Sequence, residues 1–409
     1  MSSTRSIGPS WTRLACVLVA AAALVASWTT PSFASGTSWT VTPLAIASGY
    51  WGTAESISCP APDDCVTVGR DIGPETSTGD GTVAAAASVE DAGSWSPFAA
   101  VTPGAVTQQG WLESVSCWAA GKCVAVGMAP PSALPHMIAY ELDGATWTAL
   151  SPPPLPSADV PIGNGVSVSC VGAGTCRVMG PVSRSPRGAT VRAFVATYVA
   201  GSWSETNFLV PPNTLDLGSI TCSSTTRCAA LLDTGSVVRN SLTVLRSYVD
   251  WMRAGGWRRT MPKGWSTLDV VGLSCPSPTT CVAAGSLRSG HSIVSRQALG
   301  WAFDVVPGGD GAGTPSCVSS TCEAIAYPPY CGLACGHGPS GSGGVLTLQG
   351  HSWTETTLAP PLGMLNNLPT ALTCNVVRCT VVGSGQVQVP DGGDGYFALP
   401  FVATSSPSG

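Results

Sequence analysis

The amino-acid sequence predicts an all-β protein in which one four-stranded unit is repeated around a closed ring. The first observation is a cysteine that is preceded by Ser or Thr and followed by a second cysteine five or six positions later, a pattern that recurs seven times at intervals of 42 to 58 residues. Such a period is typical of stacked or circular arrays of supersecondary units. The second is a tryptophan, one to three positions after a glycine, that alternates with the cysteine pairs. The third is composition, because 48 Gly, 34 Pro and only 10% charged residues favour short strands joined by turns.

The first 34 residues have the pattern of a secretory signal peptide. Two arginines precede an apolar run from Leu14 to Trp28, which is followed by the small-residue pattern Ser32-Phe33-Ala34. Cys16 lies at the front of the apolar run, whereas a lipoprotein cysteine would follow it. No later stretch reaches the roughly 18 apolar residues of a membrane helix. We therefore expect residues 35–409 to form a soluble, secreted product in the extracellular space or the cell envelope.

Charge and cysteine count limit the partners of the mature chain. Removing the leader takes away Arg5 and Arg13 but no acidic residue, which changes the net charge from −5 to −7. A nucleic-acid partner would require basic clusters, so we expect none. Sixteen of the 17 cysteines remain, and an even number suits an exported protein whose thiols are all paired.

Each repeated unit is predicted to contain four strands in meander order. The first strand ends at the first cysteine, as in 56–59, and the residue two positions before that cysteine is apolar and branched in six units, with Pro315 as the exception. The second strand starts at the second cysteine, as in 123–127, and a third follows a variable loop, as in 136–142. The fourth strand carries the tryptophan, as at Trp147. Four strands in this order form a blade of a β-propeller.

The order of the markers along the chain predicts how the ring closes. The mature chain opens with a tryptophan strand, 38–43, and its last unit has none, because only one strand, about 395–402, follows the last cysteine pair. We therefore predict a seven-bladed β-propeller of four-stranded antiparallel blades, closed by an N-terminal strand that completes the last blade. A linear solenoid would need capping units, and neither end of the chain resembles one.

The cysteine pairs are predicted to be disulfides rather than metal ligands. Their spacing differs from the usual zinc spacing, and no histidine recurs beside them. Facing residues of a hairpin lie about 4.5 Å apart at Cα in a non-hydrogen-bonded pair, within reach of a disulfide. An eighth pair, in an enlarged loop of the sixth blade, fits a local clamp better than a redox site, which would have Cys-x2-Cys spacing. The predicted disulfide cysteines are Cys59/Cys65, Cys117/Cys123, Cys170/Cys176, Cys222/Cys228, Cys275/Cys281, Cys317/Cys322, Cys331/Cys335 and Cys374/Cys379.

One further motif gives the chain a resemblance to a known group. The turn before the tryptophan strand reads Asp143-Gly144-Ala145-Thr146-Trp147 in one unit and Asp91-Ala92-Gly93-Ser94-Trp95 in another, and the other five units keep only the glycine and tryptophan. In this the chain resembles the propellers of the BNR, or Asp-box, group of secreted bacterial proteins. Sialidases of that group imply six blades, an arginine trio and a tyrosine–glutamate pair. Three arginines recur in register nowhere in this sequence, so the resemblance implies a turn that seats a core tryptophan and not a sialidase.

Three tryptophans are candidates for ligand binding. Trp51, Trp111 and Trp265 each lie six to ten residues before a first cysteine, in the connection that leads into a blade. In a propeller these connections open on one face, around the central channel, while the disulfide hairpins lie on the other. Exposed aromatic side chains there can stack on sugar rings or anchor a protein. The alternative is that the three tryptophans fill gaps between blades.

Two carboxylates are the only candidates for catalysis. Glu55 and Glu113 share one register, four residues before a first cysteine, in neighbouring blades. Two carboxylates at a channel mouth could divide acid and base roles in glycoside cleavage. A salt bridge between Glu55 and Arg70, at the end of the neighbouring strand, is the alternative.

The sequence thus favours a secreted, non-enzymatic recognition propeller for an extracellular glycan or protein. We expect it to be a monomer and to use no metal ion or cofactor. The alternative is a glycoside hydrolase or lyase of the sialidase-like propeller type that uses the two glutamates. Replacing both glutamates by glutamine separates the two hypotheses, because only an enzyme would lose turnover.

Overall fold

The computed structural model describes most of the chain from residue 38 to residue 406. The chain divides into two compact units, Met1–Ser32 and Phe33–Gly409, and every described residue belongs to the second. The signal peptide predicted for residues 1–34 lies outside the described residues. The described ranges are 38–73, 82–101, 110–129, 136–155, 159–161, 165–172, 174–184, 191–207, 214–234, 237–238, 241–242, 246–253, 256–260, 265, 268–277, 279–287, 292–297, 301–306, 311–318, 321–328, 341–349, 352–388 and 396–406.

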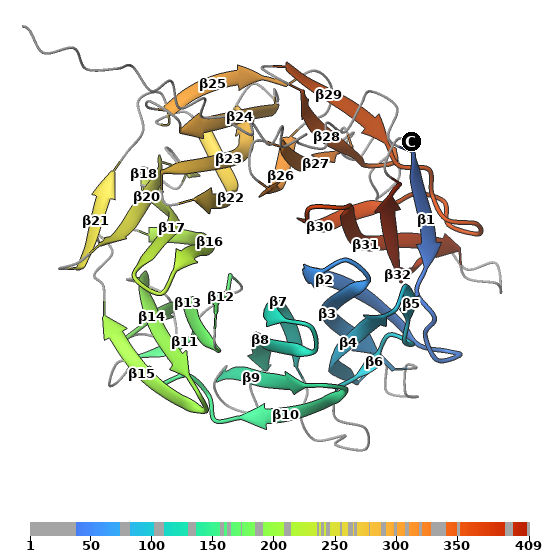
Figure 1. The fold of residues 1–409 in the computed structure, drawn as a ribbon, viewed down its shortest axis with the longest axis horizontal. Coiled ribbons are helices and arrows are strands. Elements are labelled where there is room, and N and C mark those ends of the chain that lie inside the picture. The colour runs from blue at the N-terminus through green and yellow to red at the C-terminus, as the bar shows by residue number, and fades with distance from the viewer. Residues whose placement is uncertain are drawn as a thin grey trace, which may run out of the picture. The chain divides into compact units, whose positions relative to one another are not determined.

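The described strands form antiparallel sheets that are arranged as the blades of a β-propeller, as predicted (Figure 1). We name each blade by its innermost strand. From the ring axis outward, the β2 blade contains β2 (Trp51–Ala61), β3 (Asp64–Ile72) and β4 (Val83–Asp91), and the short strands β5 (Ser94–Trp95) and β6 (Ala99–Ala100) both pair with β4. The β7 blade contains β7 (Trp111–Ala119), β8 (Lys122–Ala129), β9 (His136–Asp143) and β10 (Thr146–Leu150). In the β12 blade, β12 (Ser167–Val171) and β11 (Val160–Pro161) both pair with β13 (Thr175–Ser183), which is followed by β14 (Val191–Val199) and β15 (Ser202–Asn207).

The remaining blades have the same outward order. The β16 blade contains β16 (Thr214–Ser224), β17 (Arg227–Thr234), β20 (Arg246–Arg253) and β21 (Gly256–Thr260). Between β17 and β20 in the sequence, β18 (Val237–Val238) and β19 (Ser241–Leu242) form a separate two-stranded hairpin. The β22 blade contains β22 (Leu268–Ser277), β23 (Thr280–Leu287), β24 (Ser292–Gln297) and β25 (Trp301–Val305); the β26 blade contains β26 (Gly311–Val318), β27 (Thr321–Tyr327), β28 (Gly344–Gln349) and β29 (Ser352–Thr357); and the β30 blade contains β30 (Leu368–Cys374), β31 (Cys379–Gln388), β32 (Tyr396–Ser405) and β1 (Trp39–Pro43). No helix in these ranges has the length and hydropathy needed to cross a membrane.

The first strand of the chain completes the blade formed by the last three. β1 pairs antiparallel with β32, from Trp39 opposite Ser405 to Pro43 opposite Phe401. The pairing extends beyond the strand, since the Leu44 N–H donates to the Pro400 carbonyl at 2.9 Å. Figure 1 shows β1, in blue, as the outer strand of this red-brown sheet. The predicted closure by an N-terminal strand is confirmed.

Seven of the predicted disulfides are present, and each one joins the first two strands of a blade. The Cα atoms of the paired cysteines lie between 3.9 and 4.1 Å apart. In five of the hairpins the two cysteines are direct partners in the ladder. The eighth predicted pair, Cys331 and Cys335, lies outside the described residues. The confirmed pairs are Cys59–Cys65, Cys117–Cys123, Cys170–Cys176, Cys222–Cys228, Cys275–Cys281, Cys317–Cys322 and Cys374–Cys379.

The second cysteine of each of these disulfides is buried, whereas the first is more exposed. Each second cysteine lies at the start of the second strand of its blade and belongs to a different hydrophobic core cluster, so these positions are parts of the core and not of an accessible site. The exposed fraction is 3% or less at Cys65, Cys123, Cys176, Cys228, Cys281, Cys322 and Cys379.

The tryptophan of each outer strand packs on a hydrophobic core, as the sequence analysis expected. The Asp-box-like turns lie between the third and fourth strands, with Gly93 and Gly144 at φ values of +80° and +64°, a region that favours glycine. Each tryptophan that follows such a turn belongs to a core cluster or packs against one. These residues are Trp39, Trp95, Trp147, Trp203, Trp257, Trp301 and Trp353.

The side chains of each innermost strand face the preceding blade and the next blade in alternation. Side chains two positions before the first cysteine point back to the preceding blade: Ile57 packs with Val382 of the β30 blade, and Val115 packs with Val66 of the β2 blade. Side chains one and three positions before the cysteine are mostly serine, and they face the next blade. The branched apolar residue found in the sequence is therefore a contact between blades.

Serine hydroxyls join each blade to the next by hydrogen bonds that we call the serine ladder. Ser56 accepts from the Val115 N–H at 3.1 Å, and Ser58 accepts from the Cys117 N–H at 3.0 Å. An innermost strand is a sheet edge whose N–H groups have no strand partner, and a buried N–H without an acceptor is costly. The ladder supplies this acceptor. The equivalent bonds run from Val168 to Ser114, Cys170 to Ser116, Ile220 to Ser167, Cys222 to Ser169, Leu273 to Ser219, Cys317 to Ser274 and Cys374 to Ser316.

At one position of the serine ladder, both the hydroxyl acceptor and the N–H donor are missing. Gly272 occupies the register of Ser56 and Ser114, and the residue that would donate to it is Pro315, which has no N–H. A Cβ atom at Gly272 would lie 2.6 Å from the Thr314 Cα and 2.8 Å from the Pro315 Cδ. The proline ring therefore fills the space that a serine takes elsewhere, which explains the exception at Pro315 in the apolar pattern.

Gly272→Ser should therefore destabilise the protein by about 1–3 kcal/mol through overpacking against Pro315. Pro315→Val alone should cost about 1 kcal/mol, because it introduces an N–H without an acceptor. The double variant should regain most of both losses, because it recreates the donor and acceptor found at the other ladder positions. Denaturant unfolding of the four proteins measures this coupling, and additive losses would contradict the pairing.

Candidate ligand-binding site

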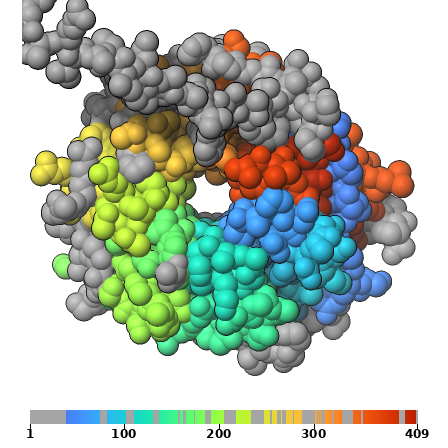
Figure 2. All heavy atoms as spheres, in the orientation of Figure 1, coloured from blue at the N-terminus to red at the C-terminus, as the bar shows by residue number. Residues whose placement is uncertain are grey.

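A cavity of about 750 Å³ lies where the innermost strands meet around the ring axis. Figure 2 shows the opening on this axis, bordered by blue β2-blade and red β30-blade segments. The wall combines hydroxyl groups, small apolar side chains and a few charges. It is lined by Glu55, Ser56, Ile57, Arg70, Trp111, Glu113, Ser114, Gly165, Val166, Ser167, Gly218, Ser219, Ile220, Thr221, Val271, Leu273, Thr314, Thr370, Ala371 and Leu372.

Glu113 holds Trp111 in the wall of this cavity. The indole Nε1–H of Trp111 donates to one carboxylate oxygen of Glu113 at 2.7 Å. The other oxygen accepts from the backbone N–H groups of Gly165 and Val166, at 2.8 and 2.7 Å, so the carboxylate also ties β7 to the start of the next blade. Burial raises the pKa of Glu113, these hydrogen bonds oppose the rise, and the nearby Glu55 charge adds to it. The indole is therefore fixed before any ligand arrives.

Glu55 belongs to a second polar group on the same wall. The Thr53 hydroxyl donates to Glu55 Oε1 at 2.6 Å, and Arg70 Nε donates to the Thr53 hydroxyl at 3.0 Å. Arg70 Nε also lies 3.9 Å from Glu55 Oε1. The salt bridge that the sequence analysis weighed against a catalytic role is therefore present. The Glu55 side chain is 32% exposed, so its carboxylate is reachable from the cavity.

The two other candidate tryptophans do not line the cavity. Trp265 is 0% exposed and its ring meets Trp301 edge-on at 4.7 Å, within the core between two blades. The expectation that it is an exposed ligand-binding residue is corrected, because its side chain fills the gap that the alternative hypothesis described. Trp51 is partly exposed and lies 6.5 Å, centroid to centroid, from Phe397 of the β30 blade.

Sequence reasoning missed the hydroxyl groups of the cavity wall. Ser56, Ser114 and Ser167 line the cavity and also accept the ladder bonds. The signal was visible as the Ser-x-Ser-Cys pattern, but its meaning depends on which blade the next strand faces. Thr53 was missed too, although it lies between Trp51 and Glu55 on the same strand.

One cluster in the described part of the chain has the residue types of a metal site. Glu323, Cys374 and Cys379 place their ligand atoms within 4.8 Å of one another. The two cysteines form a disulfide, so they offer no thiolate, and a thiolate is the form that binds metal. This cluster is a buried carboxyl group beside a disulfide.

The chain matches no protein-family model and no curated protein sequence. Its structure is similar to that of a protein of unknown function from Dyadobacter fermentans, with 10% identity, a TM-score of 0.48 and coverage of 91% of this chain and 100% of the other. A Hadza microbial sialidase shares 10% identity at a TM-score of 0.46, over 72% of this chain and 65% of the sialidase. AofleA from Arthrobotrys oligospora shares 13% identity at a TM-score of 0.46, over 80% and 90% of the two chains. These likenesses concern the fold alone.

The geometry of the cavity suits binding better than proton transfer. Both oxygens of Glu113 are occupied by three donors, so the carboxyl group cannot reach a substrate without releasing Trp111 or the β12 segment. Only Glu55 has a carboxylate that faces the cavity with a single short hydrogen bond. A fixed indole, a reachable carboxylate and several hydroxyl groups are the elements that hold a polyhydroxylated ligand.

Proposed function

We propose that this chain is a secreted, non-enzymatic recognition propeller that binds an extracellular glycan in the axial cavity. The mature product is residues 35–409, a closed ring of seven blades of the BNR, or Asp-box, type, and residues 1–34 are the signal peptide removed on export. Seven hairpin disulfides support an oxidising compartment, and the pairing of β1 with β32 supports closure of the ring. A protein ligand is the other partner that the sequence allowed, and the small polar cavity favours the glycan.

The observation that carries the proposal is the fixed orientation of Trp111. Its N–H is bound by Glu113, so the indole has little rotamer freedom to lose when a ligand stacks on it. Glu55, Arg70 and the serine hydroxyls then supply acceptors and donors for sugar hydroxyl groups.

A glycoside hydrolase or lyase remains the second candidate function. It is favoured by one observation, the presence of Glu55 and Glu113 on the wall of one cavity, close enough for the charge of Glu55 to raise the pKa of Glu113. The three hydrogen bonds to Glu113 count against it, as does the ion pair between Glu55 and Arg70.

Trp111→Ala should weaken glycan binding at least about tenfold, because it removes the stacking surface. Binding of the purified mature protein is measured on a glycan array and then by calorimetry, with product analysis of every glycan retained. Trp118→Ala is the matched control, since Trp118 lies in a disulfide hairpin at the opposite end of β7. Equal binding by wild type and Trp111→Ala would refute the assignment of the site.

The same measurements separate recognition from catalysis. A retained glycan without cleavage supports recognition. Cleavage that disappears in both Glu55→Gln and Glu113→Gln, with binding preserved, would establish the hydrolase or lyase instead.

A further inference from the structure

Exposed apolar side chains gather at one end of the β30 and β2 blades. β31 ends at Gln388, β32 starts at Tyr396 and β2 starts at Trp51, each at the end of its sheet opposite the disulfide hairpin. Tyr396 and Phe397 are 49% and 37% exposed, and Tyr50 is 38% exposed. We call Tyr50, Trp51, Tyr396 and Phe397 the aromatic shelf. The rings of Trp51 and Phe397 are in contact, and exposed apolar side chains at one end of two neighbouring blades are candidates for a contact surface.

The aromatic shelf spans the junction between two blades and adjoins the cavity. The rings of Trp51 and Phe397 meet across this junction, with centroids 6.5 Å apart and planes at 40°. Trp51 lies four residues before Glu55 on β2, and Leu368 lies two residues before Thr370 at the start of β30; Glu55 and Thr370 both line the cavity. A ligand that leaves the cavity beside these two strands therefore meets the shelf next.

The described segments that carry the shelf contain no charged residue. These segments, 44–54, 358–372, 379–388 and 396–405, have no Asp, Glu, Lys or Arg. The neighbouring strand β3 does carry charge, but its Arg70 lies 3.9 Å from Glu55 on the cavity wall, and these two charges offset each other. The surface therefore fits an uncharged partner.

The segment beside the shelf is held in place before binding. The Leu365 N–H donates to the Gln386 carbonyl at 2.8 Å, and the Asn366 side-chain amide donates to the Gln386 side-chain carbonyl at 2.7 Å. Asn367 is 0% exposed and donates from Nδ2 to the Leu358 carbonyl at 2.7 Å. A surface fixed in this way has a smaller ordering cost on binding than a mobile loop.

We infer that the aromatic shelf extends the axial cavity as additional subsites for an uncharged, extended polysaccharide chain. The inference rests on the proposed function, since it concerns the same glycan. One sugar unit lies against Trp111 in the cavity, and following units run over the β2 strand and place their C–H faces on Trp51 and Phe397. The protein then recognises a run of sugar units rather than a single terminal residue.

The test is the dependence of affinity on chain length. The probes are neutral cello-, xylo-, manno-, malto- and chito-oligosaccharides from disaccharide to hexasaccharide, together with the anionic oligogalacturonates, titrated by calorimetry against the mature protein. For the series that binds, we expect the wild-type affinity to rise about tenfold from disaccharide to hexasaccharide. Phe397→Ala, alone and with Trp51→Ala, should remove this rise while leaving disaccharide affinity unchanged.

The control variant carries Val376→Ala and Val377→Ala, exposed apolar residues in the hairpin at the other end of the β30 blade, and should retain the rise. Affinity that does not depend on length, or oligogalacturonate binding as tight as that of the neutral series, overturns the shelf subsites but leaves the proposed function standing. A change of molar mass with concentration that Phe397→Ala abolishes, measured by light scattering, would assign the shelf to a second copy of the chain. Absence of binding to every series would refute glycan recognition itself, and the subsites with it.

Discussion

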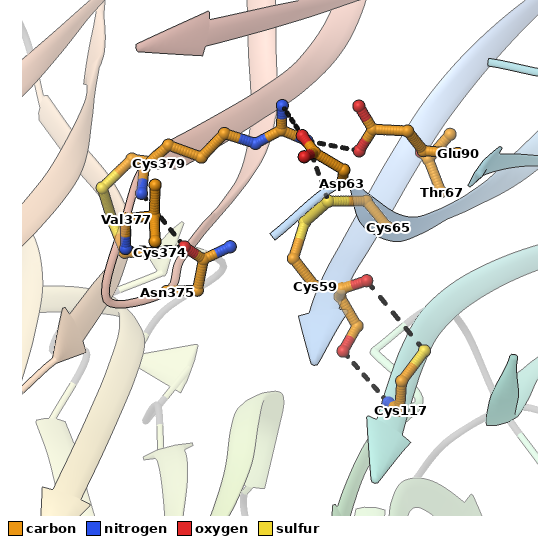
Figure 3. The surroundings of a disulfide bond; sticks show 12 residues. Cys59, Asp63, Cys65, Thr67, Glu90, Cys117, Cys374, Asn375, Val377 and Cys379 are labelled. Atoms are coloured by element: carbon orange, nitrogen blue, oxygen red, sulfur yellow. Dashed lines mark hydrogen bonds and ion pairs between the residues drawn. A yellow bond between two sulfur atoms is a disulfide. The ribbon is translucent and has the colours of Figure 1, made fainter. Parts of the chain in front are cut away.

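Replacing Arg378 by methionine is expected to lower the free energy of unfolding by about 3–5 kcal/mol, because it leaves a buried carboxylate without its partner. Arg378 lies in the disulfide hairpin of the β30 blade and reaches across to the β2 blade, where it lies 2.5 Å from Glu90 and 2.8 Å from Asp63. Figure 3 shows the carboxylates of Glu90 and Asp63 close together near the Cys59–Cys65 disulfide, with these ion pairs drawn as dashed lines. Glu90 is 2% exposed, and burial raises its pKa while Arg378 opposes the rise. Denaturant unfolding of the purified variant measures the loss.

Two further variants test this explanation. Glu90→Leu should restore most of the stability lost in Arg378→Met, since Leu142 and Leu348 pair with the tryptophans of the β7 and β26 blades as Glu90 pairs with Trp95, and both are buried. Asp63→Asn is the matched control, with an expected loss of at most about 1 kcal/mol, because the Asp63 side chain is 55% exposed. If Arg378→Met were as stable as wild type, the ion pair would not hold the junction.

Replacing Glu323 by glutamine is expected to raise the free energy of unfolding above pH 8 by about 3 kcal/mol. Glu323 is 0% exposed, faces the disulfide of the next blade with an oxygen 3.9 Å from the Cys374 sulfur, and has a Thr347 hydroxyl at 3.5 Å. Burial raises its pKa from 4.5 to about 7. The folded protein therefore holds a proton that the unfolded chain releases, and the wild type loses stability as the pH rises from about 4.5 through about 7.

The pH profile distinguishes this effect from a general gain of stability. Wild type and Glu323→Gln should differ little near pH 4, where both states carry the proton, and should diverge between pH 5 and pH 8. Asp91→Asn is the control, because Asp91 is an exposed carboxylate at the end of β4 and its replacement should change the profile little. Parallel profiles for wild type and Glu323→Gln would show that the buried carboxyl group does not titrate in this range.

The repeated parts of the fold could be predicted because they are local. A cysteine pair five or six residues apart can cross-link the two strands of one hairpin without involving any other part of the chain, and a tryptophan after a Gly turn marks the strand that follows it. The pairing of β1 with β32 was predictable for a different reason: one strand was left over at each end of the chain. By contrast, Arg378 and Glu90 are 288 residues apart, and nothing in either neighbourhood identifies the other as its partner.

The candidate site could be predicted only where two blades place a residue at the same distance from the first cysteine. Glu55 and Glu113 stand at the same distance from their cysteines, and both line the cavity. Trp111 lies on the same strand, only two residues from Glu113, which makes its place predictable as well. Trp265 lies ten residues before its cysteine, in a connection before β22. Its distance along the chain does not determine whether the ring turns outward or into the core, and it turned into the core.

The serine ladder gives the ring a direction. Every bond described in it runs from an amide of one blade to a hydroxyl of the blade before it, as in a head-to-tail cyclic assembly where donor and acceptor faces differ. A fragment of several blades would therefore present one unsatisfied amide edge and one unsatisfied hydroxyl edge, and neither could pair with its own kind. Among the described residues, the last junction shows no such bond: Ala371 replaces the ladder serine, the Thr370 hydroxyl donates to the Ala54 carbonyl instead, and Arg378 supplies a charge. Truncated chains of this protein should accordingly associate end to end instead of back to back.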